Sequence, residues 1–323
     1  MESHDHNSVL YREAVESMNI RANGIYVDAT FGRGGHSQSI LQALDDSGRL
    51  VAIDCDAQAV AYANQHLGHD KRFEIVRSNY SEIEAVAREL KLIGVIDAVL
   101  FDLGVSSPQL DVAERGFSFD RDGPLDMRMN QDTGIPVSEW LAEVDADELA
   151  NVFRDYGEER YARRIARRVV EVASERPVTR TLDLAQIIKD AHPRWERHKH
   201  PATRCFQALR IVINRELDHL RTALEGCVEV LRPGGRMVVI SFHSLEDRIV
   251  KRFFRGSPDS PDGESAGKRK MHKFPPRGLP LSADGKGARV MKAVGKAIRP
   301  TDHEVRLNPR SRSSVMRVAE KLA

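Results

Sequence analysis

This sequence contains few cysteines. It has no apolar segment of membrane-spanning length and no Gly-x-Gly-x-x-Gly motif. Its 323 residues include only three cysteines, Cys55, Cys205 and Cys227. Because they are odd in number and far apart, they fit neither a disulfide framework nor a zinc site. The first seven residues are polar and no apolar stretch follows them, so we expect neither a secretion signal nor a membrane anchor. These absences argue against a secreted disulfide-rich protein and lead us to expect a cytoplasmic one.

A glycine-rich turn near the N-terminus is the first feature that points to a ligand. An apolar run over 24–27 predicts a strand ending at Asp28, and apolar residues at helical spacing over 38–44 predict a helix, with Gly32, Gly34 and Gly35 between them. This arrangement brings the N–H groups of a helix start against a nucleotide-like ligand. An acid before the glycines suits an ammonium-bearing aminoacyl group better than a pyrophosphate. That favours S-adenosylmethionine over NAD; a glycine-rich connection without a ligand is the alternative.

Three further strands are predicted, and each is followed closely by a residue that can contact such a ligand. Apolar runs of the kind found in parallel sheets occur at 49–54, 72–76 and 96–103. Asp54 ends the first of these, where an acid accepts hydrogen bonds from ribose hydroxyls; capping the next helix is its alternative role. Tyr80 follows the second run, and Asp102 lies at the end of the third. Strands alternating with helices predict a doubly wound α/β sheet with the ligand at the carboxyl ends of its strands.

After the fourth strand the pattern changes to loops and helices. Residues 104–130 are rich in Gly, Pro, Ser and Asp, and helical segments are predicted at 137–142, 146–156, 159–174 and 182–191. We therefore expect three regions. They are a first part of the cofactor-binding core at 1–104, an inserted helical domain for substrate recognition at 105–210, and a second part of the core at 211–323.

The second part of the core is predicted to begin with a helix and to end in a basic segment. An apolar stripe predicts one long helix over 207–230. A further helix is predicted in the first part of the core, at Ser81–Leu90, with a capping box formed by Ser81 and Glu84. A strand is predicted at 236–242, with His243 directly after it. Residues 256–289 are expected to form a basic loop, followed by strand-like runs at 290–298 and 313–319.

The net charge of +1 hides an uneven distribution. From Arg248 to the end there are 19 Lys and Arg against 7 Asp and Glu, whereas the rest of the chain has 30 against 41. This asymmetry suggests a polyanionic partner, a solvated basic tail being the alternative. The insertion has basic clusters of its own, which we take as candidate nucleic-acid contacts: Arg163, Arg164, Arg167, Arg194, Arg197 and Lys199. For the arginine helix the alternative is a solvated face with acidic partners, such as Glu159 for Arg163.

Four motifs together produce a family resemblance. They are the glycine turn at 28–37, Phe101-Asp-Leu-Gly-Val-Ser-Ser-Pro-Gln109, Ser241-Phe-His-Ser-Leu-Glu-Asp-Arg248 and Asn308-Pro-Arg-Ser-Arg-Ser313. In combination they closely resemble the bacterial small-subunit ribosomal RNA cytosine-N4 methyltransferase family, RsmH or MraW. The resemblance implies a class I S-adenosylmethionine-dependent methyltransferase fold, Rossmann-like, with a seven-stranded, mostly parallel sheet and an inserted helical domain.

The same resemblance implies a reaction and its partners. The reaction is methyl transfer from S-adenosylmethionine to the exocyclic N4 of a cytidine in the decoding region of 16S rRNA, within the small ribosomal subunit. We expect a monomer or a weak homodimer. The cofactor contacts correspond to Gly34, Gly35, His36, Asp54, Asp102 and Gln109, with Tyr80 stacking on adenine; Asp28 and Gly32 join them from the turn pattern. No metal site is expected, since the histidines lack a convincing set of ligand partners.

The implied chemistry needs a proton acceptor at the target amine. The amino lone pair of cytosine is delocalised into the ring, and an acceptor at the N4 hydrogens localises it and takes up a proton. Asp102 is the first candidate, assisted by Ser106 or Ser107, and His243 is the second. The alternative is that Asp102 only holds the cofactor and His243 only braces the site.

Two other functions compete with this interpretation. An NAD-dependent oxidoreductase is one, and Asp28 together with the missing dinucleotide fingerprint argues against it. The other is a ribosome-assembly docking factor that keeps a vestigial cofactor pocket.

Overall fold

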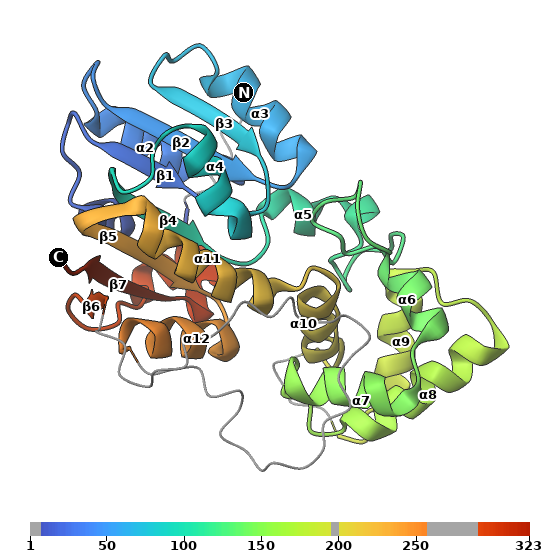
Figure 1. The fold of residues 1–323 in the computed structure, drawn as a ribbon. Coiled ribbons are helices and arrows are strands. Elements are labelled where there is room, and N and C mark those ends of the chain that lie inside the picture. Colours follow the sequence, from blue (N-terminus) through green and yellow to red (C-terminus); the bar gives the residue numbers. More distant parts are fainter. Residues whose placement is uncertain (1–7, 195–199, 257–289) are drawn as a thin grey trace. The chain divides into compact units, whose positions relative to one another are not determined.

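The computed structural model describes residues 8–194, 200–256 and 290–323. The chain forms two compact units, one made of 1–104 with 217–323 and the other of 105–216. The first carries the sheet and the second is helical (Figure 1). Arg197, Lys199 and all of the predicted loop 256–289 except Gly256 lie outside the described residues.

In the first unit, seven strands form one sheet in the order β3-β2-β1-β4-β5-β7-β6. The strands from β1 to β5 run parallel, whereas β7 is antiparallel to both β5 and β6. Their bounds are β1 Ile25–Asp28, β2 Arg49–Asp54, β3 Phe73–Arg77, β4 Ile96–Asp102, β5 Leu231–Ser241, β6 Met291–Ala293 and β7 Val315–Lys321. The predicted seven-stranded, mostly parallel sheet is confirmed. Its strand order reverses between β1 and β4, which is where ligands bind in doubly wound sheets.

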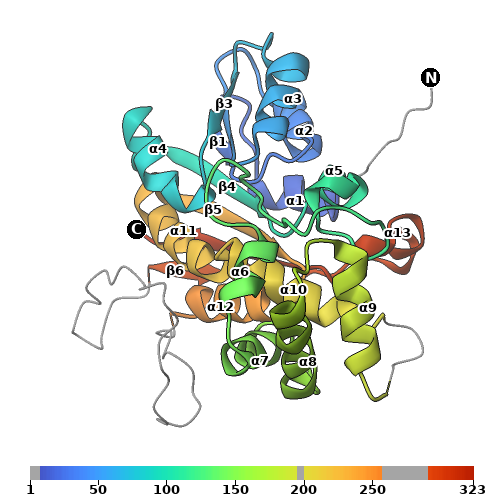
Figure 2. The same cartoon turned by 90° about the vertical axis from the view of Figure 1, so that its right-hand side faces the viewer.

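Helices cover both faces of this sheet because its central strands are apolar on both sides. In β4, every residue before Asp102 is buried. Figure 2 shows α2 and α3 on one face and α4 and α11 on the opposite face. Side chains of the first face, among them Leu10, Tyr26, Ile40 and Leu100, form one core cluster. The helices of this unit are α1 Tyr11–Met18, α2 Gly35–Ala43, α3 Ala57–Leu67, α4 Ile83–Glu89, α11 Glu216–Val230, α12 Ser244–Phe254 and α13 Asp302–Leu307.

The second unit has a hydrophobic core of its own. Its helices are α5 Ser107–Asp111, α6 Val137–Glu143, α7 Ala146–Asp155, α8 Ala162–Glu175, α9 Thr181–Ala191 and α10 Ala202–Ile213. Phe153, Ile165, Leu184 and Phe206, each from a different helix, are buried together. The amphipathic spacing of α8 explains its orientation, since Ile165, Ala166 and Val169 face this core while the intervening arginines are exposed.

The single helix predicted over 207–230 is wrong, because the chain breaks it at Asn214 and Arg215. Arg215 has a left-handed backbone with φ of 49°. The Asn214 side chain accepts the Met129 N–H (2.7 Å) and donates to the Met127 carbonyl (2.8 Å). These bonds to a distant loop favour the break, whereas the apolar stripe continues across it in the sequence and hides it.

The predicted capping box at Ser81 and Glu84 is also wrong. A short 3-10 helix, η1 Tyr80–Glu82, precedes α4. Asn79 begins it, with its side-chain oxygen accepting the Ser81 N–H at 2.9 Å. Asn is as good a cap as Ser, and here it lies two residues earlier.

The C-terminal strands are placed differently from their predicted bounds. The run 290–298 forms only the three-residue strand β6, with Ile298 adding an isolated bridge to Met316. The run 313–319 shifts by two residues to become β7. None of the helices within the described residues has the length and apolar content that a bilayer crossing requires.

Candidate active site

The predicted ligand residues Asp28, Asp54, Tyr80 and Asp102 all lie at or just after the carboxyl ends of adjacent parallel strands. Two hydrogen bonds connect these ends through the glycine turn. The Gly32 N–H donates to Asp54 Oδ2 (2.8 Å), and the Asp102 N–H donates to Thr30 Oγ1 (2.7 Å). The turn after β1 is therefore joined to both β2 and β4.

Asp28 is buried beneath the glycine turn and accepts hydrogen bonds from it. It is 1% exposed; Ser37 Oγ donates to its Oδ2 (2.6 Å), and the Thr30 N–H donates to its Oδ1 (3.2 Å). Burial raises the pKa of Asp28, opposed mainly by the hydrogen bond from Ser37. Contact between Asp28 and a cofactor ammonium stays a prediction, because both oxygens already have partners within the turn.

Asp54 is better placed to receive a ligand. Its two oxygens accept the N–H groups of Gly32 and Asp56, both at 2.8 Å, and each oxygen has a further lone pair. Burial raises the pKa of Asp54 to about 6, although these two N–H groups lower it. The alternative role of capping α3 belongs to Asp56, whose side chain accepts the Gln58 N–H. The Asp54 carboxylate thus remains a candidate acceptor for ribose hydroxyls.

Gly34 and Gly35 shape the start of α2. Gly34 has φ of +73°, and a Cβ at this position lies 2.6 Å from the Phe31 ring. A Cβ on Gly35 overlaps Ser8 Oγ. Glycine is therefore required here by backbone conformation and by close packing, independently of any ligand.

His36 and Asp102 have buried polar atoms without hydrogen-bond partners in the described residues. His36 is 4% exposed, and its Nε2 lies 3.4 Å from Asp102 Oδ2. Burial lowers the pKa of His36, but the neighbouring carboxylates Asp102 and Asp28 raise it, and the net shift is upward. Within the described residues, neither ring nitrogen of His36 nor Asp102 Oδ1 makes a hydrogen bond. Buried polar atoms of this kind are rare, and a group that binds next to them is one explanation.

Four other predicted residues are placed by local structure. Tyr80 lies edge-on to Phe101, with ring centroids 5.9 Å apart. In the helical unit, Ser106 caps α5, which starts at Ser107, and the Gln109 side chain accepts the Ser106 N–H at 2.9 Å. This reciprocal cap orders the segment that follows Asp102 in the chain. The roles predicted for these four residues stay predictions.

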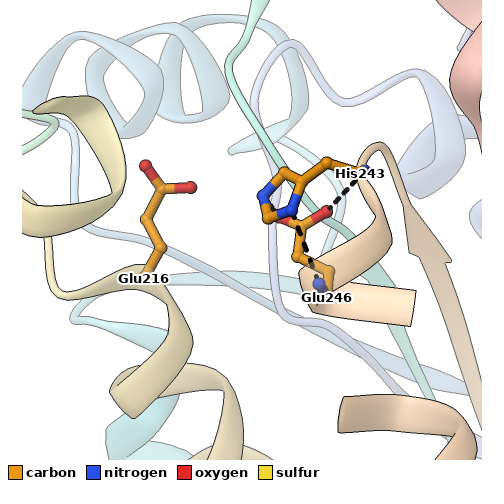
Figure 3. A group of neighbouring side chains, drawn as sticks. All are labelled: Glu216, His243 and Glu246. Atoms are coloured by element: carbon orange, nitrogen blue, oxygen red, sulfur yellow. Dashed lines mark hydrogen bonds and ion pairs between the residues drawn. The ribbon is translucent and has the colours of Figure 1, made fainter. Parts of the chain in front are cut away.

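His243 begins α12, directly after β5, and pairs with Glu246 (Figure 3). Its Nε2 lies 3.2 Å from Glu246 Oε1, and Glu246 Oε2 accepts the Phe242 N–H at 2.8 Å. The two residues cap α12 together, and the proton-handling and bracing roles considered for His243 stay predictions. Glu216, also drawn in Figure 3, begins α11 and accepts two hydrogen bonds from Arg210.

The basic face of α8 is exposed. In the described part of the chain, Arg163, Arg164 and Arg167 have no ionic partner, whereas Arg168 pairs with Glu171 at 2.9 Å. Glu159, the acidic partner suggested for Arg163, is instead 3% exposed and accepts the Tyr161 N–H. The example pair of Glu159 with Arg163 is therefore wrong, because Glu159 is buried within its unit, whereas a solvated face with other acidic partners stays an alternative for α8. Arg194 is also exposed.

The sequence did not reveal Thr30 as the acceptor for the Asp102 N–H. The two bonded residues, Thr30 and Asp102, are 72 positions apart, and a threonine in a glycine turn is no signal by itself. A further contact of this kind, from Glu304 to Leu10, spans 294 positions.

These residues fit S-adenosylmethionine. Three carboxyl groups at one sheet edge favour a cationic ligand, and a sulfonium with an ammonium group is one. Asp54 suits the ribose, Tyr80 provides an aromatic ring, and α2 begins at Gly35 with N–H groups available to a carboxylate. The unsatisfied atoms of His36 and Asp102 leave polar capacity for the ligand or its substrate.

Comparison with known proteins finds similar sequences over nearly the whole chain. The sequence profile described as the MraW methylase family matches residues 3–322. The ribosomal RNA small subunit methyltransferase H of Legionella pneumophila (strain Paris) is 51% identical over 318 residues, covering 98% of this chain and 99% of its own. That of Thioalkalivibrio sulfidiphilus (strain HL-EbGR7) is 52% identical, covering 98% of each. Among solved structures, an rRNA methylase from Streptococcus thermophilus is 13% identical with a TM-score of 0.39, covering 96% of this chain and 92% of that one.

Proposed function

The chain belongs to the MraW methylase family, and from this premise we propose that it methylates the exocyclic N4 of one cytidine in the decoding region of 16S rRNA, within the small ribosomal subunit. The fold is that of a class I methyltransferase, and S-adenosylmethionine is its cofactor. The names of the relatives support small-subunit rRNA as the substrate.

We choose an amine as the target because one carboxylate oxygen of Asp102 has no hydrogen-bond partner among the described residues. Asp102 Oδ1 is buried and makes no hydrogen bond within the described residues, while Oδ2 faces His36. An amino group has two N–H bonds to donate, so a buried acceptor without a partner suits it. A carboxylate in this place also has the capacity to take a proton.

We assign the cofactor to Gly34, Gly35, His36, Asp54 and Tyr80. When bound, S-adenosylmethionine supplies an already activated methyl group. The protein therefore has mainly to position the amine and to exclude water. The helix start at Gly35 would hold the aminoacyl end of the cofactor, Asp54 its ribose and Tyr80 its adenine, with Gln109 and Asp28 as further candidates.

Asp102 acts on the amine. Its carboxylate accepts a hydrogen bond from N4 and thereby concentrates the lone pair on the nitrogen. After transfer it takes up the proton that N4 loses and later releases it to solvent. His36 lies 3.4 Å from Asp102 and, when protonated, forms an ion pair with it. His243 braces the end of the neighbouring strand β5, and Ser106 and Ser107 are the assisting candidates.

The RNA is held by exposed cations of the helical unit. Arg163, Arg164 and Arg167 are exposed without ionic partners among the described residues, and Arg194 joins them. Unpaired guanidinium groups bind phosphates, often in a bidentate manner. The target base has to leave any stack to reach the strand ends.

Tritiated S-adenosylmethionine tests the proposed function. The protein is incubated with small subunits from cells that lack it, the rRNA is digested, and the labelled nucleoside is identified by mass spectrometry. Label on N4 of a single cytidine is the expected result, and deproteinised 16S rRNA serves as the parallel substrate. Label on another atom or nucleotide rejects the N4 assignment. No label, with S-adenosylhomocysteine still bound in calorimetry, favours the docking factor.

A further inference from the structure

The first described residues of the chain, 8–11, lie against the glycine turn. Ser8 Oγ occupies the space that a Cβ on Gly35 needs. The Tyr11 ring stacks with the His36 imidazole, with centroids 6.1 Å apart and an interplanar angle of 24°, and its hydroxyl is hydrogen-bonded to Ser39. We call residues 8–11 the N-terminal segment. It contacts two residues, Gly35 and His36, that the proposed function assigns to the cofactor.

Leu10 has an unfavourable backbone conformation within this segment. It precedes α1 with φ of 50° and ψ of 38°, in the left-handed region, and its side chain is fully buried. A bulky residue rarely adopts this conformation. Leucine also has no side-chain oxygen with which to cap the helix that follows it. The conformation of Leu10 therefore depends on contacts from elsewhere.

The contact to the Leu10 backbone comes from near the other end of the chain. The Leu10 N–H donates to Glu304 Oε1 at 2.7 Å, across 294 positions. Glu304 lies in α13, where Thr301 Oγ1 accepts its N–H at 3.2 Å. Hydrogen bonds to a carboxylate are stronger than those between neutral groups, and a negative charge at the start of α1 interacts favourably with the helix dipole.

Resting on the proposed function, we propose that Glu304 is a positioning residue for the S-adenosylmethionine site. By holding the Leu10 backbone, it keeps Tyr11 against His36 and Ser8 against Gly35. His36 lies 3.4 Å from Asp102, so the connection extends from the C-terminal helix α13 to the proposed proton acceptor. Both α1 and α13 belong to the sheet-bearing unit (Figure 2).

Calorimetric titration of the full chain with S-adenosylhomocysteine tests this role. Glu304→Gln keeps the length and the oxygen acceptor, Glu304→Asp keeps the charge but shortens the side chain, and Glu304→Ala removes both. We expect Glu304→Asp and Glu304→Ala to bind S-adenosylhomocysteine roughly tenfold more weakly, and Glu304→Gln, which keeps an acceptor but loses the charge, roughly threefold more weakly. Asp302→Ala, an exposed acid on the same short helix, is the control and should bind like the wild type.

A second measurement tests the stability of the N-terminal segment in the absence of any ligand. Amide hydrogen exchange at Leu10 and Tyr11 should be faster in Glu304→Asp than in Glu304→Gln. Unchanged S-adenosylhomocysteine affinity in Glu304→Asp, or an equal loss in Glu304→Gln, overturns the proposal. If Glu304→Ala does not fold, the other two variants decide it. Because calorimetry reads cofactor binding alone, an error in the rRNA assignment does not affect this test.

Discussion

Gly34→Ala is the perturbation whose magnitude follows most directly from the structure. At φ of +73° an alanine is strained by about 1 kcal/mol relative to glycine. The added Cβ also lies 2.6 Å from the ring of Phe31, a buried core residue, so the ring has to move. Overpacking of this kind costs about 1–3 kcal/mol. We expect Gly34→Ala to lower the free energy of unfolding by about 2–4 kcal/mol.

Gly94→Ala provides a matched control in the same unit. Gly94 has the same φ of +73°, but no atom lies within 4 Å of its added Cβ. It should therefore show only the conformational cost of about 1 kcal/mol. Urea denaturation measures both variants, and a shift in midpoint at constant slope reports the change in stability.

The cofactor site gives a second difference between the two variants. Displacing Phe31 disturbs the turn before α2, so S-adenosylhomocysteine should bind Gly34→Ala roughly tenfold more weakly, while Gly94→Ala binds it normally. Equal destabilisation of the two variants would refute the steric argument. Wild-type affinity in Gly34→Ala would refute the assignment of this turn to the cofactor.

Three other predictions concern Asp54, Asp102 and the arginines of α8. Because the pKa of Asp54 is raised to about 6 by burial and the ribose contact needs the carboxylate, S-adenosylhomocysteine affinity should fall about tenfold from pH 7.5 to pH 5, as the carboxyl gains its proton. Asp54→Asn should lose this dependence. Asp102→Asn should reduce the methylation rate about 10²–10⁴-fold while calorimetry shows the cofactor still bound. Reversing Arg163 and Arg167 to Glu should weaken binding to small subunits and flatten its salt dependence, whereas Arg88→Glu on α4 should not.

Each of these has an outcome that contradicts it. A pH dependence that survives in Asp54→Asn means that another group, with His36 the first to examine, controls binding. Full turnover in Asp102→Asn removes its role as acceptor. Equal binding and equal salt slopes in the arginine and Arg88 variants remove α8 as an RNA surface.

The fold was predictable because its signals are local. Apolar runs alternate along the chain with segments whose apolar residues have helical spacing, and this local pattern predicts a doubly wound sheet without knowledge of any contact. All seven predicted strands are present. The errors lie where distant residues compete with a local pattern. The apolar stripe over 207–230 continues through Asn214, but that side chain bonds to Met127 and Met129 and the helix ends there.

The amino-acid sequence was enough to identify the residues at the sheet edge, because the carboxyl ends of parallel strands meet there. It did not distinguish Asp28, Asp54 and Asp102 from one another, since all three simply end strands. Only the tertiary structure separates them. Asp28 has both oxygens bonded inside the turn, Asp54 has its pKa raised to about 6, and Asp102 has an oxygen without a hydrogen bond in the described residues. Burial and hydrogen bonding depend on partners far away in the chain, and these set the chemistry of a carboxyl group that the residue name leaves open.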